Sequence, residues 1–244
     1  MPNIKQITVI GNSVTLRVRP PEAEERNNNK VYGVLLEEEL NKTGNWFTNN
    51  LGLSRRIVEE FHENKDLFIR TFPNYFVINL GCVDAPTREI PLWFSDIIYR
   101  RKNVFFYPVF NFIYSRLIKK YLRTQLVILR GKRPWVSPTK FQKNFSLMLD
   151  VLIKETSANI IVLGINRGNE RIERSLPGTN KNYIRYDEII KNLCSRPFVD
   201  FIDVSHLNSQ EHFPDGIHYN FEGHKKIKEA IYKCIVKREN ERKV

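Results

Sequence analysis

Short apolar runs alternate with amphipathic segments along this chain of 244 residues. The runs at 75–80 and 159–164 are continuously apolar, which is typical of parallel strands buried on both faces. Further strand patterns occur at 7–10, 45–50 and 198–204, and helical spacing occurs at 31–40, 54–61 with Ser54 as N-cap, 139–155, 184–193 and 221–237. This alternation predicts the α/β class: a three-layer, flavodoxin-like α/β/α sandwich with a central parallel sheet of about five strands.

The segment 90–138 departs from this alternation, because aromatic residues are mixed there with many Lys and Arg residues. We favour a pair of long core helices whose Lys and Arg tips reach solvent. The alternative is a basic amphipathic element that contacts a membrane or an acceptor glycan, and a substrate cleft or a dimer face is also open. We therefore predict a single domain over 1–244 with an aromatic and basic helical insertion at about 90–138.

The composition suits one globular domain, since 41% of the residues are hydrophobic. No window has the roughly 18 uncharged apolar residues that a membrane span needs, and the first residues lack the pattern of a signal peptide. Three widely spaced cysteines, Cys82, Cys194 and Cys234, argue against a disulfide framework and fit a reducing compartment. We expect a cytoplasmic protein, and the sequence does not indicate its oligomeric state.

The formal net charge of +12 has two interpretations. It favours either an anionic partner, such as a charged sugar, an acidic glycan or a membrane surface, or simply a solvated basic surface. No signature of a nucleic-acid-binding module accompanies the charge, so the sequence disfavours a nucleic-acid partner.

The candidate chemistry lies near the two ends of the chain. Asp215 precedes His218 by three residues, just before the helix predicted at 221–237, and Ser13 follows the apolar strand at 7–10. A Ser hydroxyl becomes an effective nucleophile when a base takes its proton. His218 is our candidate base, and Asp215 is the carboxylate that would orient its ring and stabilise the imidazolium.

Several blocks of the sequence together resemble the SGNH (GDSL-like) hydrolases over about residues 5–235. They are Gly11-Asn12-Ser13, Asn50-Leu51-Gly52-Leu53-Ser54, Asn79-Leu80-Gly81-Cys82-Val83-Asp84, and Asp215-Gly216-Ile217-His218 followed by Gly223-His224. The resemblance implies an SGNH hydrolase-like fold, an ester substrate and an acyl-enzyme on Ser13. It also implies that the backbone N–H groups of Ser13 and Gly52 bind the oxyanion.

The sequence departs from this family at two positions. Val83 stands where the family has an Asn that donates to the oxyanion, and loss of one such donor typically lowers the rate by about 10²–10³. Arg88 is our candidate substitute, with a surface charge or an ion pair to Asp84 as the alternative. Asn12 stands where Asp is usual; we take Asn12 and Asp84 as candidate substrate-binding residues, although Asn12 also suits a hydrogen bond within a turn.

Other chemistries receive less support. Four histidines recur every six residues from His206 to His224, but six residues turn a helix by roughly 240°, so successive members would not share a face. The sequence shows no Gly-x-Ser-x-Gly, P-loop or Gly-x-Gly-x-x-Gly motif. We therefore expect neither a metal site nor a cofactor.

We predict a serine-dependent ester hydrolase or acyltransferase that acts on an O-acylated sugar or glycan precursor. The expected partner is thus a small-molecule or glycan ester, and it is anionic if the positive net charge of the protein reflects an anionic partner. A lipid or thioester substrate is the nearest alternative within the enzyme class. Val83 favours a second class, a catalytically impaired protein of the same fold that binds a glycan or partner. A third class is an interaction protein that makes peripheral membrane contact through the segment 90–138.

Overall fold

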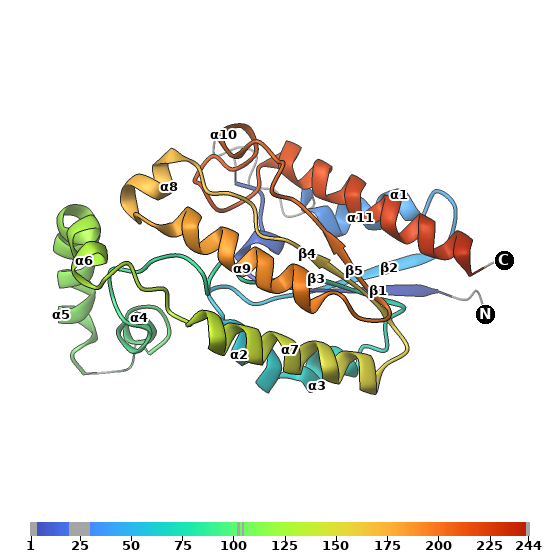
Figure 1. The fold of residues 1–244 in the computed structure, drawn as a ribbon, viewed down its shortest axis with the longest axis horizontal. Helices are drawn as coiled ribbons and strands as arrows, with labels where there is room; N and C mark the ends of the chain where they lie inside the picture. Colours follow the sequence, from blue (N-terminus) through green and yellow to red (C-terminus); the bar gives the residue numbers. More distant parts are fainter. Residues whose placement is uncertain (1–3, 20–29, 102, 104, 243–244) are drawn as a thin grey trace.

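A computed structural model describes residues 4–19, 30–101, 103 and 105–242 (Figure 1). Its five strands form one sheet: β1 (Lys5–Gly11), β2 (Trp46–Gly52), β3 (Tyr75–Asn79), β4 (Asn159–Leu163) and β5 (Val199–Ile202). The strand order is β2-β1-β3-β4-β5, and every neighbouring pair is parallel. The predicted α/β fold with a parallel sheet of five strands is confirmed. The chain reverses its direction across the sheet at β1, which is where open α/β sheets bind ligands.

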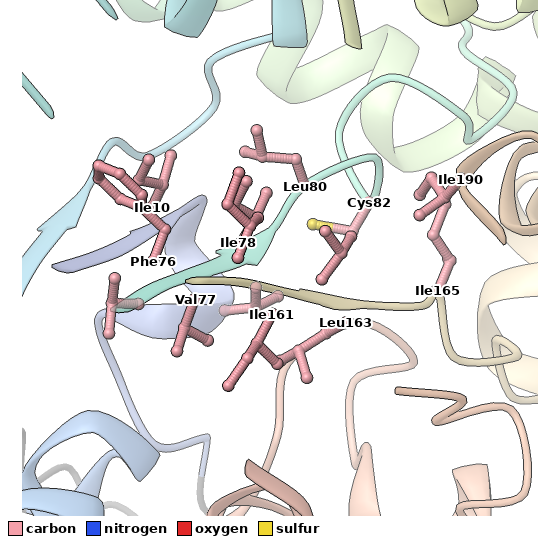
Figure 2. Packing of buried hydrophobic residues seen from close by; sticks show 14 of the residues in the cluster. Ile10, Phe76, Val77, Ile78, Leu80, Cys82, Ile161, Leu163, Ile165 and Ile190 are labelled. Atoms are coloured by element: carbon pink, nitrogen blue, oxygen red, sulfur yellow. The ribbon is translucent and has the colours of Figure 1, made fainter. Parts of the chain in front are cut away.

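The apolar runs of β3 and β4 are buried along their whole length, as their continuous pattern predicts. Alternate side chains point to opposite faces of the sheet, so Phe76 and Ile78 lie on one face and Val77 on the other (Figure 2). The core therefore consists of two apolar layers, one on each side of the sheet.

Helices cover both faces of the sheet (Figure 1). On one face, α1 (Tyr32–Leu40) packs against α11 (Phe221–Glu241). On the other face, α7 (Pro138–Glu155) contacts α2 (Val58–Glu63), α3 (Lys65–Ile69) and α9 (Thr179–Leu193). No helix in the described part of the chain combines the length and the apolar character that crossing a membrane requires.

The segment 90–138 forms short helices at one end of the molecule, away from the sheet (Figure 1). They are α4 (Leu92–Tyr99), α5 (Tyr107–Phe112), the π-helix η4 (Ile113–Leu122) and α6 (Arg123–Leu129). Our favoured interpretation of two long core helices is wrong. Apart from Val136, which joins the main core, the buried apolar side chains in the described part of the segment are Ile90, Ile98 and Tyr114 in one small cluster and Val127 of α6 in another. Other helices already cover both faces of the sheet, so only Leu92, Trp135 and Val136 among the described residues of this segment reach the main core.

The loop after β2 differs from the prediction of a helix capped by Ser54. Strand β2 continues to Gly52, and the Leu53 N–H donates to the Gly11 carbonyl, so the chain remains extended beyond the predicted boundary. Arg55 then adopts a left-handed backbone (φ 61°), and α2 begins only at Val58. The short helices α8 (Glu170–Ser175) and α10 (Ser209–His212) and the 3₁₀ turn η1 (Ser13–Thr15) were not predicted.

Candidate active site

Ser13 lies just beyond the carboxyl end of β1, where the chain turns sharply into η1. Gly11 makes this turn feasible, because a Cβ atom there would lie 2.1 Å from Cγ2 of Thr15. The Thr15 hydroxyl donates to the Asn12 carbonyl and closes the turn. The sequence thus holds the Ser13 hydroxyl at the switch point of the sheet.

Asp215 and His218 lie on the loop that leads into α11. The loop turns at Gly216, whose φ of 84° favours glycine. Asn169 secures the loop from outside, since its side-chain amide donates to the Phe213 carbonyl over 2.9 Å. Asn220 ends the loop by capping α11 through the Gly223 N–H.

The structure brings Ser13, His218 and Asp215 together in a continuous hydrogen-bonded chain. Ser13 Oγ lies 2.8 Å from His218 Nε2, and His218 Nδ1 lies 2.8 Å from Asp215 Oδ2. Because an ionised carboxylate only accepts hydrogen bonds, Nδ1 carries the proton and Nε2 is left to accept from the Ser13 hydroxyl. This is the geometry that nucleophilic catalysis by a serine requires.

The carboxylate of Asp215 is stabilised in its charged form. Burial raises its pKa, but the hydrogen bond and charge of His218 outweigh burial and hold the pKa well below its usual range. The backbone N–H groups of Ile217 and His218 both donate to Oδ1. Arg19 Nε donates to Oδ2 over 2.9 Å, so one oxygen receives both the imidazole and a guanidinium.

A cavity of about 200 Å³ opens beside Ser13 and His218. Val83, Arg88 and Trp135 line it, so the position where SGNH hydrolases have their oxyanion Asn does face this cavity. A second cavity of about 260 Å³ adjoins it and shares Arg88, Trp135 and His218. The two cavities are therefore neighbours, and Ser13 lines the first of them.

Gly52, predicted as an oxyanion donor, does not line this cavity. Its N–H group donates to Oδ1 of Asn50, so the amide already has a partner. The cause is the longer strand β2, which keeps Gly52 in register with Gly11. Ser54 and Arg55 line the cavity in its place.

Arg88, the residue predicted to replace the oxyanion Asn, lines both cavities. One of its amino groups donates to the Val83 carbonyl over 2.8 Å, and the guanidinium stacks on Trp135 with its carbon 3.9 Å from the ring centre. The Nε atom of Arg88 is buried and has no acceptor in the described part of the chain.

Asn12 and Asp84 are not substrate-binding residues, because both side chains are fully buried. The Asn12 amide donates to the carbonyls of Leu53 and Arg56, which makes it the alternative we gave, a hydrogen-bonding turn residue. Asp84 Oδ1 accepts from the N–H of Val58 and thereby satisfies the first donor of α2. Burial raises the pKa of Asp84 to about 7.

Sequence reasoning missed several residues of the site. Arg17, Arg19, Arg55 and Trp135 line the cavities, and none of them belongs to a block that resembles the SGNH family. The repeated arginines between 17 and 19, directly after Ser13, were the one signal that could have indicated them. Trp135 carried no signal, since only the fold brings it to the Ser13 cavity.

His224 makes structural hydrogen bonds beside the site. It is fully buried; its Nδ1 accepts from the Tyr32 N–H over 3.1 Å, and its Nε2 donates to the Arg17 carbonyl over 3.2 Å. Burial lowers the pKa of His224 to about 4, so the ring is neutral at physiological pH. The described residues contain no group of three His, Cys, Asp or Glu side chains that could hold a metal ion.

No family model and no curated protein matches this sequence. Solved structures do match over nearly the whole chain. A lipase/acylhydrolase from Enterococcus faecalis shares 15% identity at a TM-score of 0.63 and covers 96% of both chains. The acetyl xylan esterase AlAXEase shares 14% identity at a TM-score of 0.62, covering 94% of this chain and 99% of its own.

The chain has the SGNH hydrolase fold. A carbohydrate acetylesterase family member from Sinorhizobium meliloti is similar in the same way, with 10% identity, a TM-score of 0.62, and coverage of 95% of this chain and 97% of the other. At such low identities the likeness concerns the fold, and the chemistry must be argued from the side chains of this chain.

Proposed function

We propose that this protein is a serine-dependent ester hydrolase or acyltransferase that forms an acyl-enzyme on Ser13. The observation that carries the proposal is the hydrogen-bonded chain from Ser13 Oγ through His218 to Asp215, which borders an open cavity. The resemblance in fold to lipases and esterases supports it.

The reaction follows from this geometry. Ser13 Oγ attacks the acyl carbonyl carbon while its proton passes to His218 Nε2, and Asp215 stabilises the imidazolium that results. The bond to the alcohol oxygen then breaks, and His218 returns the proton to that oxygen. Water, or the hydroxyl of an acceptor in the transfer reaction, gives its proton to His218 and attacks the acyl carbon. The bond from that carbon to Ser13 Oγ then breaks, and His218 returns the proton to Ser13 Oγ.

The oxyanion would be held by the Ser13 N–H and, in this proposal, by Arg88. Arg88 is the candidate because Val83 cannot donate and because Arg88 lines the same cavity. A guanidinium supplies several N–H donors and a positive charge, both of which favour a developing oxyanion.

We further propose an O-acylated sugar or glycan precursor as the substrate. Two proteins with a similar fold are named as an acetyl xylan esterase and a carbohydrate acetylesterase family member. The cavities are also lined by Trp135 and by several arginines, and such side chains suit a polar, hydroxyl-rich ligand.

Labelling with a fluorophosphonate probe tests the activated serine. We expect labelling of the wild type, none of Ser13→Ala, and a strong loss in His218→Ala. Ser54→Ala is the matched control, because Ser54 lines the same cavity but has no imidazole partner in the described part of the chain, so its labelling should persist. Folded wild-type protein that does not react would refute the proposal.

Val83 favours one alternative, a protein that binds the ester without turning it over. In this case the cavity binds ligand, but the missing oxyanion donor leaves the acyl transfer slow by about 10²–10³. Probe labelling at a rate no higher than that of Ser13→Ala would favour this alternative.

A further inference from the structure

Positively charged side chains surround the proposed active site. Six arginines and one lysine line the two cavities; we call them the cationic rim: Arg17, Arg19, Arg55, Arg88, Arg123, Arg171 and Lys119. Only two acidic side chains, Glu89 and Asp215, line the same cavities in the described part of the chain.

The two acids are already engaged within the protein. Asp215 accepts from His218 and Arg19, and Glu89 accepts from the Tyr114 hydroxyl and lies 3.5 Å from Arg123. Among the described residues, the side chains of Arg17 and Arg55 have no carboxylate within 4.0 Å; the salt bridges of the site all belong to other members of the rim. The rim therefore keeps an excess of positive charge.

Two of the arginines are held in fixed orientations. The Arg55 guanidinium carbon lies 3.6 Å from the ring centre of Tyr99, and Arg88 stacks on Trp135 in the same way. A stacked guanidinium keeps its in-plane N–H groups free for a carboxylate or phosphate, which it can bind in a bidentate manner. Clefts lined by one sign of charge also attract ligands of the opposite sign.

We infer that the cationic rim is an anion-binding site and that the ester bound at Ser13 carries a carboxylate or phosphate group. This inference rests on the proposed function for the ester, whereas the anion site itself does not depend on catalysis. Arg17 and Arg55 are the residues expected to contact the anion. Of the other two rim arginines that line the Ser13 cavity, Arg19 pairs with Asp215 and Arg88 already donates to the Val83 carbonyl.

Calorimetric titration of the wild-type protein with pyrophosphate and with citrate tests the anion site at low salt. We expect at least one of them to bind more tightly than about 1 mM and to bind at least about tenfold more weakly to Arg17→Gln/Arg55→Gln. Tighter binding of pyrophosphate would indicate a phosphate-bearing ester, and tighter binding of citrate a carboxylate-bearing one.

The control is Lys181→Gln/Lys191→Gln, which removes the same charge from exposed positions of α9. Binding that is absent, or weakened equally by both double variants, would overturn the inference, since the anion would then respond only to net charge. Probe labelling of Ser13 without anion binding would refute this inference alone. Anion binding without labelling would refute the proposed hydrolase and leave the anion site.

A second inference rests on a different observation, the exposed apolar side chains of 92–129. Six of them form what we call the insertion surface: Trp93, Phe105, Phe106, Phe112, Tyr121 and Leu129, with exposed fractions of 64%, 88%, 58%, 61%, 60% and 83%. The sequence from 97 to 133 contains ten Lys and Arg residues and no Asp or Glu, whereas the whole chain has a net charge of +12. The segment that carries this apolar surface therefore has a net positive charge, although Arg100 pairs with Glu60 and Asp96 and Arg123 with Glu89.

We propose that the insertion surface binds an anionic lipid bilayer. Large aromatic side chains enter the interface between head groups and acyl chains, while neighbouring Lys and Arg residues attract anionic head groups. A second copy of this chain is a poorer occupant, because two such surfaces would bring two segments with a net positive charge together. Charge and apolar character together thus select the membrane.

Co-sedimentation with vesicles tests this surface. The wild type should sediment with vesicles of phosphatidylcholine and phosphatidylglycerol and not with phosphatidylcholine alone. Phe105→Ser/Phe112→Ser should lose most of this binding. Leu67→Ser/Phe72→Ser, which removes two exposed apolar side chains outside the insertion, should retain it.

Three results would overturn the membrane assignment: no sedimentation with anionic vesicles, equal loss in both double variants, or a dimer in sedimentation velocity that Phe105→Ser/Phe112→Ser abolishes. The last result would make the insertion surface a contact between two copies of the chain.

Discussion

Replacement of the buried His224 should reveal an acid-sensitive contact behind the proposed active site. Its neutral ring accepts from the Tyr32 N–H and donates to the Arg17 carbonyl, so it joins α11 to α1 and to the segment that follows Ser13. A protonated ring cannot accept from Tyr32, because both ring nitrogens would then be donors. Folding therefore disfavours protonation of this histidine.

The size of the effect follows from the two pKa values. Burial lowers the pKa of His224 from 6.5 to about 4 in the folded protein. Between these values the unfolded chain binds a proton that the folded chain does not. The contribution of His224 to the free energy of unfolding is therefore fully present above pH 6.5 and declines as the pH falls toward 4. At pH 5 the loss is about 2 kcal/mol, or about 4–8 °C in melting temperature for a chain of this size.

Urea denaturation of the wild type and His224→Gln at pH 8 and pH 5 measures this contribution. The variant keeps an N–H donor for Arg17 but leaves the Tyr32 N–H without its acceptor, so we expect it to be less stable by about 1–3 kcal/mol at pH 8. The gap between the two proteins should shrink by about 2 kcal/mol at pH 5, because only the wild type carries the titrating ring.

His206→Gln, at an exposed position, shows how much of the change comes from losing any imidazole. Other buried groups, such as Asp84, are common to the wild type and the variant and cancel in the difference. A gap that is the same at both pH values would refute the neutral, hydrogen-bonded ring.

Three further substitutions have clear expectations. Asp84→Asn keeps the acceptor for the Val58 N–H. Because folding raises the pKa of Asp84 from 3.8 to about 7, the wild type loses stability as the pH rises through this range. Thermal melting should therefore show that the melting temperature of the variant, relative to that of the wild type, is higher at pH 8 than at pH 4. Gly81→Ala should lower the free energy of unfolding in urea by about 2 kcal/mol or more, because Gly81 has a φ of 103° and the new Cβ would lie 2.7 Å from Ile165. Val83→Asn should raise the rate of ester hydrolysis by at least about tenfold if its amide reaches the oxyanion, and an unchanged rate would show that this position contributes no donor.

The sequence predicted those parts of the fold that depend on the hydrophobic pattern of a single short segment. The continuous apolar runs at 75–80 and 159–164 define the two strands that are buried on both faces, β3 and β4. The segment 90–138 misled us, because spacing shows that a helix is amphipathic but not what its apolar face meets. Trp93 and Phe105 are residue types that usually pack in a core, but here they are exposed at one end of the molecule.

The residues of the candidate site likewise fall into those that a local pattern could predict and those that it could not. Asp215 and His218 were predictable because three residues and one turn fix their mutual distance. Gly52 was predicted to donate to the oxyanion, whereas β2 ends two residues later than predicted and the Gly52 N–H donates to Asn50; no local pattern reports where a parallel strand ends. The arginines of the cationic rim come from segments far apart in the chain, so only the folded structure shows that their charges add.

Arg88 belongs to both proposals, and its energetics allow them to be separated. Burial lowers the pKa of its guanidinium while the neighbouring Glu89 raises it, so the cation is held partly desolvated. A negative charge beside the guanidinium, either the oxyanion or the anionic group of the ester, would offset the cost of this desolvation. If Arg88 replaces the missing oxyanion donor, Arg88→Ala should lower kcat for a neutral ester, and adding Val83→Asn should restore part of it. If Arg88 instead binds the anionic group, Arg88→Ala should raise KM only for charged esters, and Val83→Asn should not restore it. Kinetics of the two single variants and the double variant on one neutral and one charged ester therefore assign its role.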